Sequence, residues 1–88
     1  MEFLVRQSPR TPEDRRQQVR TAERARATEL RELGILVRLW RVPGSPDSIA
    51  LYCVADATQL HDVLSSLPAF PWMTTTVEPL ATHPQEVG

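Results

Sequence analysis

The sequence predicts an α+β domain with one antiparallel four-stranded sheet and two helices on one of its faces. Short β-rich runs and helical patterns follow each other in the order strand, helix, strand, strand, helix, strand. A turn rich in proline and glycine joins the second and third strands, which makes them a hairpin. This βαββαβ order is typical of the ferredoxin-like, split βαβ fold.

The first strand is expected at residues 2–7, a run rich in β-forming apolar side chains. A helix should follow it. Thr11 is its expected cap, because Pro12 and two acidic residues come next. The helix should extend to Leu33, since Gly34 is suited to the left-handed conformation that ends a helix.

One face of this first helix combines apolar and charged residues. Successive residues turn about 100° around a helix axis, which places Glu23 and Arg26 within the apolar stripe. The apolar members of the stripe are Val19, Ala22, Leu30 and Leu33. A buried charge is costly unless it is paired, so Glu23 and Arg26 either pair with each other or line a cavity. A solvated or partner-facing pair stays an open alternative. We interpret the other helix arginines as a solvated face: Arg15, Arg16, Arg20, Arg24 and Arg31.

The second strand is expected at residues 35–42, which are apolar on both faces except for Arg38 and Arg41. Strict alternation places these two arginines on opposite faces of the sheet. After the turn, residues 48–54 should return as the antiparallel partner. Cys53 in this run is expected to be a small buried residue, and as the single cysteine it excludes an internal disulfide.

The second helix should be capped by Asp56, because Gln59 follows three residues later. Pro68 ends that helix. A stiff turn follows, in which prolines restrict the backbone around Phe70 and Trp72. We expect these two rings to pack against one end of the core, which is more common for aromatic residues than lining a ligand site.

The last strand is expected at residues 73–78 and should end at Pro79, which leaves residues 80–88 as a tail. The 88 residues therefore form a single domain, 1–88. A domain this small buries little of its surface, and its strands are apolar on two sides. We therefore expect the open face of the sheet to meet a second copy of the chain, giving a dimer or a multiple of dimers.

Composition excludes several function classes. The net charge is −1, which provides no basic field for nucleic acid, and no apolar run is long enough to span a membrane. We therefore expect a cytoplasmic protein. The sequence also has no cysteine cluster for iron and sulfur, no metal-spaced ligands for zinc, and no glycine-rich phosphate loop. What remains is a small-molecule site built from a helix carboxylate and strand arginines.

Three stretches carry a family resemblance. They are LHDVLSSLPAFPWM at residues 60–73, VRLWRV at 37–42 and THP at 82–84. Together they resemble the muconolactone Δ-isomerase family over nearly the whole chain, from Phe3 to Pro84. The resemblance implies sheet-mediated dimers of the dimeric α+β barrel type, which assemble into larger rings. It also implies a pocket between sheet and helices, closed by a neighbour's tail.

The resemblance further implies a chemistry and the residues for it. The family shifts the double bond of an unsaturated five-membered lactone by moving a proton, without a cofactor or a metal. Glu23 matches the glutamate of the family's first helix and would be the base. Arg41 matches the arginine after the strand tryptophan and would stabilise negative charge. The candidate substrate-binding residues are Arg26, Arg38, Trp40, Phe70, Trp72 and His83.

The sequence departs from the family pattern at several positions. Val37 and Arg38 stand where the family has an Arg-His pair, Arg26 replaces a leucine, and Thr82 replaces an arginine. These differences leave the substrate open between muconolactone and a larger lactone or polyketide-like enone. Two other functions stay open as well. One is a non-catalytic small-molecule-binding or subunit-interaction module, and the other is a cofactor-free cyclase or monooxygenase. The retained Glu23 favours proton transfer over both.

Overall fold

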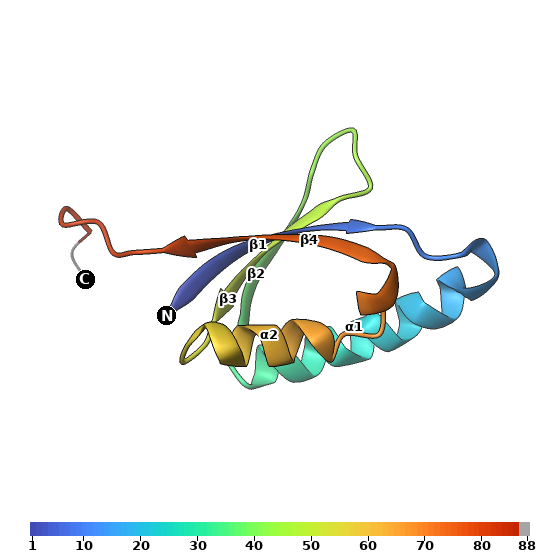
Figure 1. Cartoon of the computed structure of the whole chain (residues 1–88), viewed down its shortest axis with the longest axis horizontal. Coiled ribbons are helices and arrows are strands. Elements are labelled where there is room, and N and C mark those ends of the chain that lie inside the picture. Colours follow the sequence, from blue (N-terminus) through green and yellow to red (C-terminus); the bar gives the residue numbers. More distant parts are fainter. Residues whose placement is uncertain (87–88) are drawn as a thin grey trace.

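Four antiparallel strands form one sheet in the computed structural model, which describes residues 1–86, and two helices cover one face of that sheet (Figure 1). The strands are β1 (Glu2–Pro9), β2 (Leu36–Arg41), β3 (Ser48–Cys53) and β4 (Met73–Leu80), in the spatial order β2-β3-β1-β4. The helices are α1 (Arg16–Glu32) and α2 (Ala57–Ser65), with short 3₁₀ turns η1 (Glu13–Arg15) and η2 (Phe70–Trp72). The predicted fold class is confirmed.

The core lies between the sheet and the two helices. Val5 of β1 and Leu30 of α1 are fully buried within it. The other members of the core come from alternate strand positions, from the inner face of α2 and from the segments that follow β3 and α2: Phe3, Leu36, Ala50, Tyr52, Val54, Leu60, Val63, Leu64 and Leu67. Within residues 1–86, no helix is long and apolar enough to cross a bilayer.

Two of the predicted helix ends are confirmed. Gly34 has a φ of 73° just after α1, the left-handed conformation that glycine adopts without strain. At the start of α2, Asp56 Oδ1 accepts a hydrogen bond from the Gln59 backbone N–H at 2.8 Å. The Gln59 side chain in turn accepts from the Ala55 N–H at 2.6 Å, so two helix-start donors are satisfied.

The expected cap of α1 is wrong. Instead of Thr11, Pro12 precedes the helical region, and no side chain caps it. The Arg15 N–H bonds to the Pro12 carbonyl at 3.0 Å, which begins a 3₁₀ turn that leads into α1 at Arg16. Because the chain enters the helix through this tighter turn, the Thr11 side chain does not cap the helix. Thr11 instead lines the cavity described below.

The buried face of α1 also differs from the prediction. Ala22 is exposed and Leu33 is 68% exposed, whereas Leu30 is buried. Glu23 and Ala27 are partly buried and lie toward the sheet with Leu30. The helix is therefore rotated about its axis relative to the predicted stripe, because packing on the sheet selects the line that contains Glu23.

A β-bulge changes the pattern of β2. The pairing register with β3 shifts between Leu36 and Arg38, which leaves Val37 as the extra residue. As a result Leu36 and Leu39 both face the helices, although strict alternation puts them on opposite faces. Arg38 and Arg41 do lie on opposite faces, as expected.

The turn that contains Phe70 and Trp72, which we call the aromatic turn, packs differently from the expectation. Phe70 is 38% exposed, whereas the neighbouring Ala69 is buried. The Phe70 N–H bonds to the Leu67 carbonyl at 3.0 Å, and this 3₁₀ geometry turns the small residue inward instead of the ring. Trp72 is partly buried beneath the guanidinium of Arg15, 5.9 Å from its ring centre.

Two further expectations fail, one at the edge strand β4 and one on the inner strand β3. Strand β4 continues through Pro79 to Leu80, because β4 is an edge strand where a missing N–H costs no ladder bond. Cys53 is exposed on the face of the sheet opposite the helices, and Trp40 on the same face is 40% exposed. We call this the open face. It leaves apolar strand residues uncovered in the single chain.

Candidate active site

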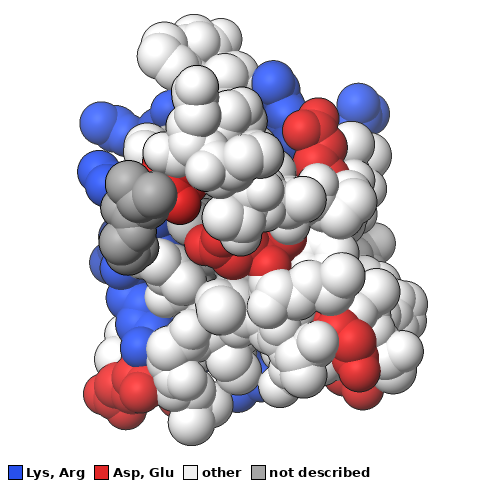
Figure 2. Space-filling view, turned by 90° about the vertical axis from the view of Figure 1, so that its left-hand side faces the viewer, with Lys and Arg blue, Asp and Glu red and all other residues white. Residues whose placement is uncertain are grey.

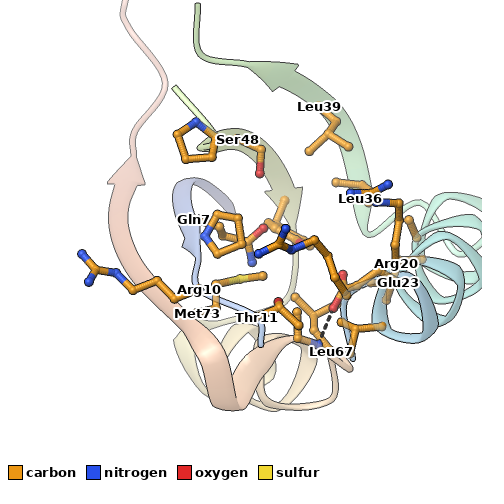
Figure 3. Close-up of a pocket in the computed structure, with 18 residues that line it drawn as sticks. Gln7, Arg10, Thr11, Arg20, Glu23, Leu36, Leu39, Ser48, Leu67 and Met73 are labelled. Atoms are coloured by element: carbon orange, nitrogen blue, oxygen red, sulfur yellow. Dashed lines mark hydrogen bonds between the residues drawn. The ribbon is translucent and has the colours of Figure 1, made fainter. Parts of the chain in front are cut away.

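A cavity of about 770 Å³ lies between the sheet and α1 (Figure 3). The sheet provides its floor through Gln7 of β1 and through Ser48 and Tyr52 of β3. Helix α1 provides the opposite wall, which includes Glu23. The segment after β1 contributes Thr11 at one end. Mixed apolar and polar walls of this kind are typical of small-molecule sites.

Glu23 is held in this cavity by the aromatic turn. Its Oε1 accepts a hydrogen bond from the backbone N–H of Ala69 at 2.7 Å, the dashed line in Figure 3. Its other oxygen receives no hydrogen bond or ion pair from residues 1–86. The carboxylate is therefore oriented through one oxygen, and the second stays available to a ligand.

Arg26 is not the partner of Glu23. Its guanidinium donates to Ser66 Oγ, at 3.2 Å from Nε and 3.0 Å from Nη2, and forms an ion pair with Glu29 at 3.0 Å. These contacts tie α1 to the end of α2. The sequence left open whether Glu23 and Arg26 pair with each other or line a cavity. In the structure Glu23 lines a cavity, and Arg26 binds Ser66 and Glu29 instead.

Tyr52 lines the cavity, although no sequence pattern indicated it as a candidate residue. Its side chain is buried on the cavity floor. Burial raises the pKa of Tyr52 to about 12, and the negative charge of Glu23 adds to the increase while Arg26 opposes it. The phenol therefore keeps its proton at neutral pH and can donate a hydrogen bond. Alternation along β3 places Tyr52 on the inner face with Ala50, but nothing in the sequence indicates that Glu23 lies near it.

Three arginines line the mouth of the cavity. They are Arg10, Arg16 and Arg20. Arg16 and Arg20 are exposed, as predicted, yet they also line the cavity on the same side of α1 as Glu23. They stand seven and three residues before Glu23, which places all three on one side of the helix, and this spacing is the signal that could have identified them. Guanidinium groups at a cavity mouth attract and bind carboxylates.

The end of the molecule that carries both termini shows no continuous basic surface on its described residues (Figure 2). Figure 2 looks onto the end of the molecule that carries both termini, where acidic groups lie among uncharged surface and arginines lie toward the edges. On the described part of this face, nothing resembles the basic patch of a nucleic-acid-binding protein. Within residues 1–86 no group of three or more His, Cys, Asp or Glu is placed to hold a metal ion.

Most other candidates from the sequence lie outside the cavity of the single chain. Arg38 stacks over Trp40 on the open face, with 5.4 Å between the guanidinium carbon and the ring centre. Arg41 is exposed at the end of β2, opposite Ser48 of the cavity floor. Phe70 and Trp72 belong to the aromatic turn and do not line the cavity. His83 lies in the tail, where its Nδ1 accepts a hydrogen bond from the Gln85 N–H at 3.0 Å.

Comparison with known proteins identifies the family. The family model described as muconolactone delta-isomerase matches residues 1–86. The chain belongs to the muconolactone delta-isomerase family. The family member named muconolactone Delta-isomerase from Rhodococcus opacus is 34% identical over 89 residues, which cover 97% of this chain and 96% of that protein. Its counterpart from Cupriavidus pinatubonensis is 34% identical over 91 residues, with 99% of each chain covered.

The fold agrees with this assignment. A crystal structure of muconolactone isomerase superposes with a TM-score of 0.91 at 30% identity, covering 100% of this chain and 96% of that one. The chain is therefore an isomerase of this family, and its reaction moves a carbon–carbon double bond. The family predicted from the sequence is confirmed, and its isomerase function is supported over the non-catalytic and cyclase or monooxygenase alternatives.

Proposed function

We propose that the chain shifts the double bond of an unsaturated five-membered lactone that bears a carboxylate, with muconolactone as the first candidate substrate. The observation that supports this is Glu23, a half-buried carboxylate with one oxygen free toward a cavity of about 770 Å³. Arginines at the cavity mouth complement an anionic substrate. The relatives that carry the name muconolactone delta-isomerase support the choice of substrate.

Glu23 would carry the proton through both steps of the reaction. Its free oxygen removes the proton from the γ carbon, and the electron pair moves through the ring double bond onto the lactone carbonyl as a dienolate. The same carboxylic acid then returns the proton to the α carbon, which leaves the double bond between the β and γ carbons. Atoms and electrons balance without an oxidant, a reductant or a cofactor.

Tyr52 is the proposed donor to the dienolate. The pKa of its phenol is raised to about 12, so it remains a donor while negative charge develops on the lactone oxygen. A preorganised donor of this kind costs no reorganisation during the reaction. Arg41 stays a proposed second source of positive charge, because its strand position faces Ser48 on the cavity floor.

The remaining sequence candidates belong to a proposed assembly of several copies. The open face carries Trp40 at 40% exposure, with Ile49 and Leu51 only partly buried beside it. A second copy would cover this surface, which a chain of 10.0 kDa is too small to bury by itself. Trp40 and Arg38 would then lie in an interface, and a neighbour's tail could bring His83 to a cavity.

The function is tested by turnover of muconolactone in deuterium oxide. Wild-type protein should form the isomer, and nuclear magnetic resonance should read the isotope at its α carbon. Deuterium is expected there if the Glu23 carboxylic acid exchanges with solvent between the two steps, and the original γ hydrogen if it does not. Glu23→Gln should bind muconolactone but lower kcat by roughly 100-fold or more, because the amide cannot accept the γ proton. The amide oxygen still accepts the Ala69 N–H, so the variant should fold.

The matched control is Glu32→Gln, which removes an exposed carboxylate at the end of the same helix. Its kcat should equal that of the wild type. Turnover by Glu23→Gln at the wild-type rate would place the base elsewhere. Loss of folding in Glu23→Gln would instead assign Glu23 a structural role as the acceptor for the aromatic turn.

A further inference from the structure

A second polar region lies on the cavity floor, away from Glu23. Gln7 lines the cavity and is only 6% exposed. Among the described residues it is the polar residue that is classed as buried. Its Nε2 has no hydrogen-bond partner within residues 1–86. Directly across the strand pair, Thr75 of β4 also has a buried hydroxyl without a partner in the described residues.

The strand register extends this region into a row. Gln7 pairs with Thr75 on one side and with Ser48 of β3 on the other, and Ser48 also lines the cavity. Three polar side chains therefore lie at one level across β3, β1 and β4, on the side of the sheet that faces the helices. Two of the three include an unpartnered buried atom. We call Ser48, Gln7 and Thr75 the polar row.

Such an arrangement is costly in an empty protein. A buried amide without a hydrogen bond loses its contacts with water and gains nothing in return. Native structures contain few such groups, and two adjacent ones indicate a site where a polar partner is supplied from outside the chain. The neighbouring inward position on β1 is Val5, which is fully buried and offers no acceptor.

The position of the row relative to the reacting residues decides what it could bind. Tyr52 pairs with Phe3, four residues before Gln7 on β1, so the two levels are about 13 Å apart along the strand at the usual rise per residue. Arg10 and Thr11 follow directly after β1 and line the cavity at the Gln7 end. In Figure 3 Gln7 and Glu23 are drawn on the floor and on the helix side of the same cavity.

We propose that Gln7 determines substrate specificity by donating a hydrogen bond from Nε2 to the carboxylate arm of the lactone. The lactone ring then lies near Glu23 and Tyr52, and the arm extends along the sheet toward Gln7. Thr75, beside Gln7 on the neighbouring strand, has an unpartnered hydroxyl of its own and is the second donor for this arm. This inference rests on the proposed function, because it uses the ring position given there. The preferred substrate class is a lactone with an acceptor-bearing arm, and an unsubstituted ring would be discriminated against.

The test combines one substitution with two ligands. Gln7→Met keeps the length and volume of the side chain but removes its donor. With muconolactone, KM should rise roughly 10-fold or more while kcat stays close to the wild-type value, since the contact is the same in ground and transition states. With γ-crotonolactone, which has the ring and lacks the arm, wild type and Gln7→Met should bind equally weakly by calorimetry.

A structural role for Gln7 predicts different results. If the amide stabilised the fold, Gln7→Met would unfold at lower urea concentration, whereas removal of an unpartnered buried amide should leave stability unchanged or raised. Thr75→Val, which has the same shape without the hydroxyl, should weaken muconolactone binding in the same direction by a smaller factor.

Two outcomes would overturn the proposal. One is equal affinity of wild type and Gln7→Met for muconolactone, and the other is an equal loss of affinity for both ligands. The calorimetric comparison does not require turnover. If the chain bound muconolactone through Gln7 but did not isomerise it, the proposed function would fail and the specificity role of Gln7 would stand.

Discussion

The two faces of the sheet are made by the same strands and have opposite uses. On the side that faces the helices, polar groups are few, buried and placed around a cavity, as for Gln7 and Tyr52. On the open face, charged groups are exposed and lie beside apolar residues such as Trp40, under the guanidinium of Arg38. Burial changes the pKa and strengthens the interactions of a polar group, which favours a role in binding or catalysis. A cluster of exposed apolar side chains instead favours an interaction surface.

The difference in solvent exposure between the two faces explains why the candidate site lies on the covered face. A carboxylate that approaches the open face meets solvent, which screens its interactions. In the cavity, Glu23 has one oxygen fixed by the Ala69 N–H, and nearby Tyr52 is held in its protonated form. Electrostatic interactions are stronger where water is excluded, so small geometric differences there change rates.

The largest expected effect on stability comes from a comparison of a buried and an exposed leucine on α1. Leu30→Ala should lower the free energy of unfolding by about 3 kcal/mol, because Leu30 is 1% exposed and its removal leaves a cavity in the core. Leu33→Ala, three residues later and 68% exposed, should change it by less than about 0.5 kcal/mol. Urea unfolding of both variants measures the difference. Equal effects would mean that Leu33 is covered in an assembly.

The next effect concerns the open face. Trp40→Glu should weaken self-association by roughly 100-fold, because it places a charge in an apolar surface that a second copy is proposed to cover. Light scattering at micromolar concentration should then return a mass near 10.0 kDa, compared with a multiple of it for the wild type. Leu33→Glu, exposed on α1, is the control and should leave the assembly intact. A monomeric wild type would remove the assembly proposal.

The order of elements, the end of α1 at Gly34 and the cap of α2 could be predicted from sequence because these signals are local, whereas the predicted cap of α1 at Thr11 was wrong. Proline, glycine and the Asp56 and Gln59 pair act on the backbone within a few residues. What could not be predicted depends on contacts between distant segments. The bulge at Val37 and the rotation of α1 result from packing on the sheet, and both decide which side chains reach the cavity.

The candidate site was predicted in part. The position of Glu23 at a cavity could be predicted, since a charge inside an apolar helix stripe is visible in the sequence, and its role as the base stays a prediction. Gln7 and Tyr52 were missed, because an inward polar residue on a strand has meaning only once its neighbours are known. Phe70 was expected in the core, but the 3₁₀ turn places Ala69 there instead. The backbone N–H of Ala69, not a ring, is what the stiff turn presents to Glu23.

A smaller effect tests the chemistry of the covered side. Tyr52→Phe should lower kcat by roughly 10-fold with little change in KM, because it removes a donor to the dienolate without changing the ring. Since the phenol pKa is raised to about 12, ionisation of Tyr52 should cause no loss of activity between pH 7 and about 10. Steady-state rates across that range measure both effects. An unchanged kcat would show that Tyr52 only packs the floor.

The smallest expected effect lies at the open face and depends on pH. The Ser8 hydroxyl and the Arg6 guanidinium hold the pKa of Asp47 below its usual value of 3.8. Arg6 contacts Asp47 Oδ2 at 2.9 Å from Nη2 and at 3.0 Å from Nε. A carboxylate with a lowered folded pKa stabilises the fold at pH values above its unfolded pKa. That stabilisation is lost as the pH falls through the folded value.

Asp47→Asn should therefore be less stable than the wild type at pH 7, and the difference should shrink as the pH is lowered below about 4. Urea unfolding at several pH values measures this. Arg6→Gln removes one of the two main causes of the lowered pKa, so its own stability should depend less steeply on pH in the same range. If wild type and Asp47→Asn instead kept a constant difference from pH 7 to pH 3, the Asp47 contact would act only by tying the β2–β3 turn to β1. The charge of Asp47 would then make no contribution to the stability of the fold.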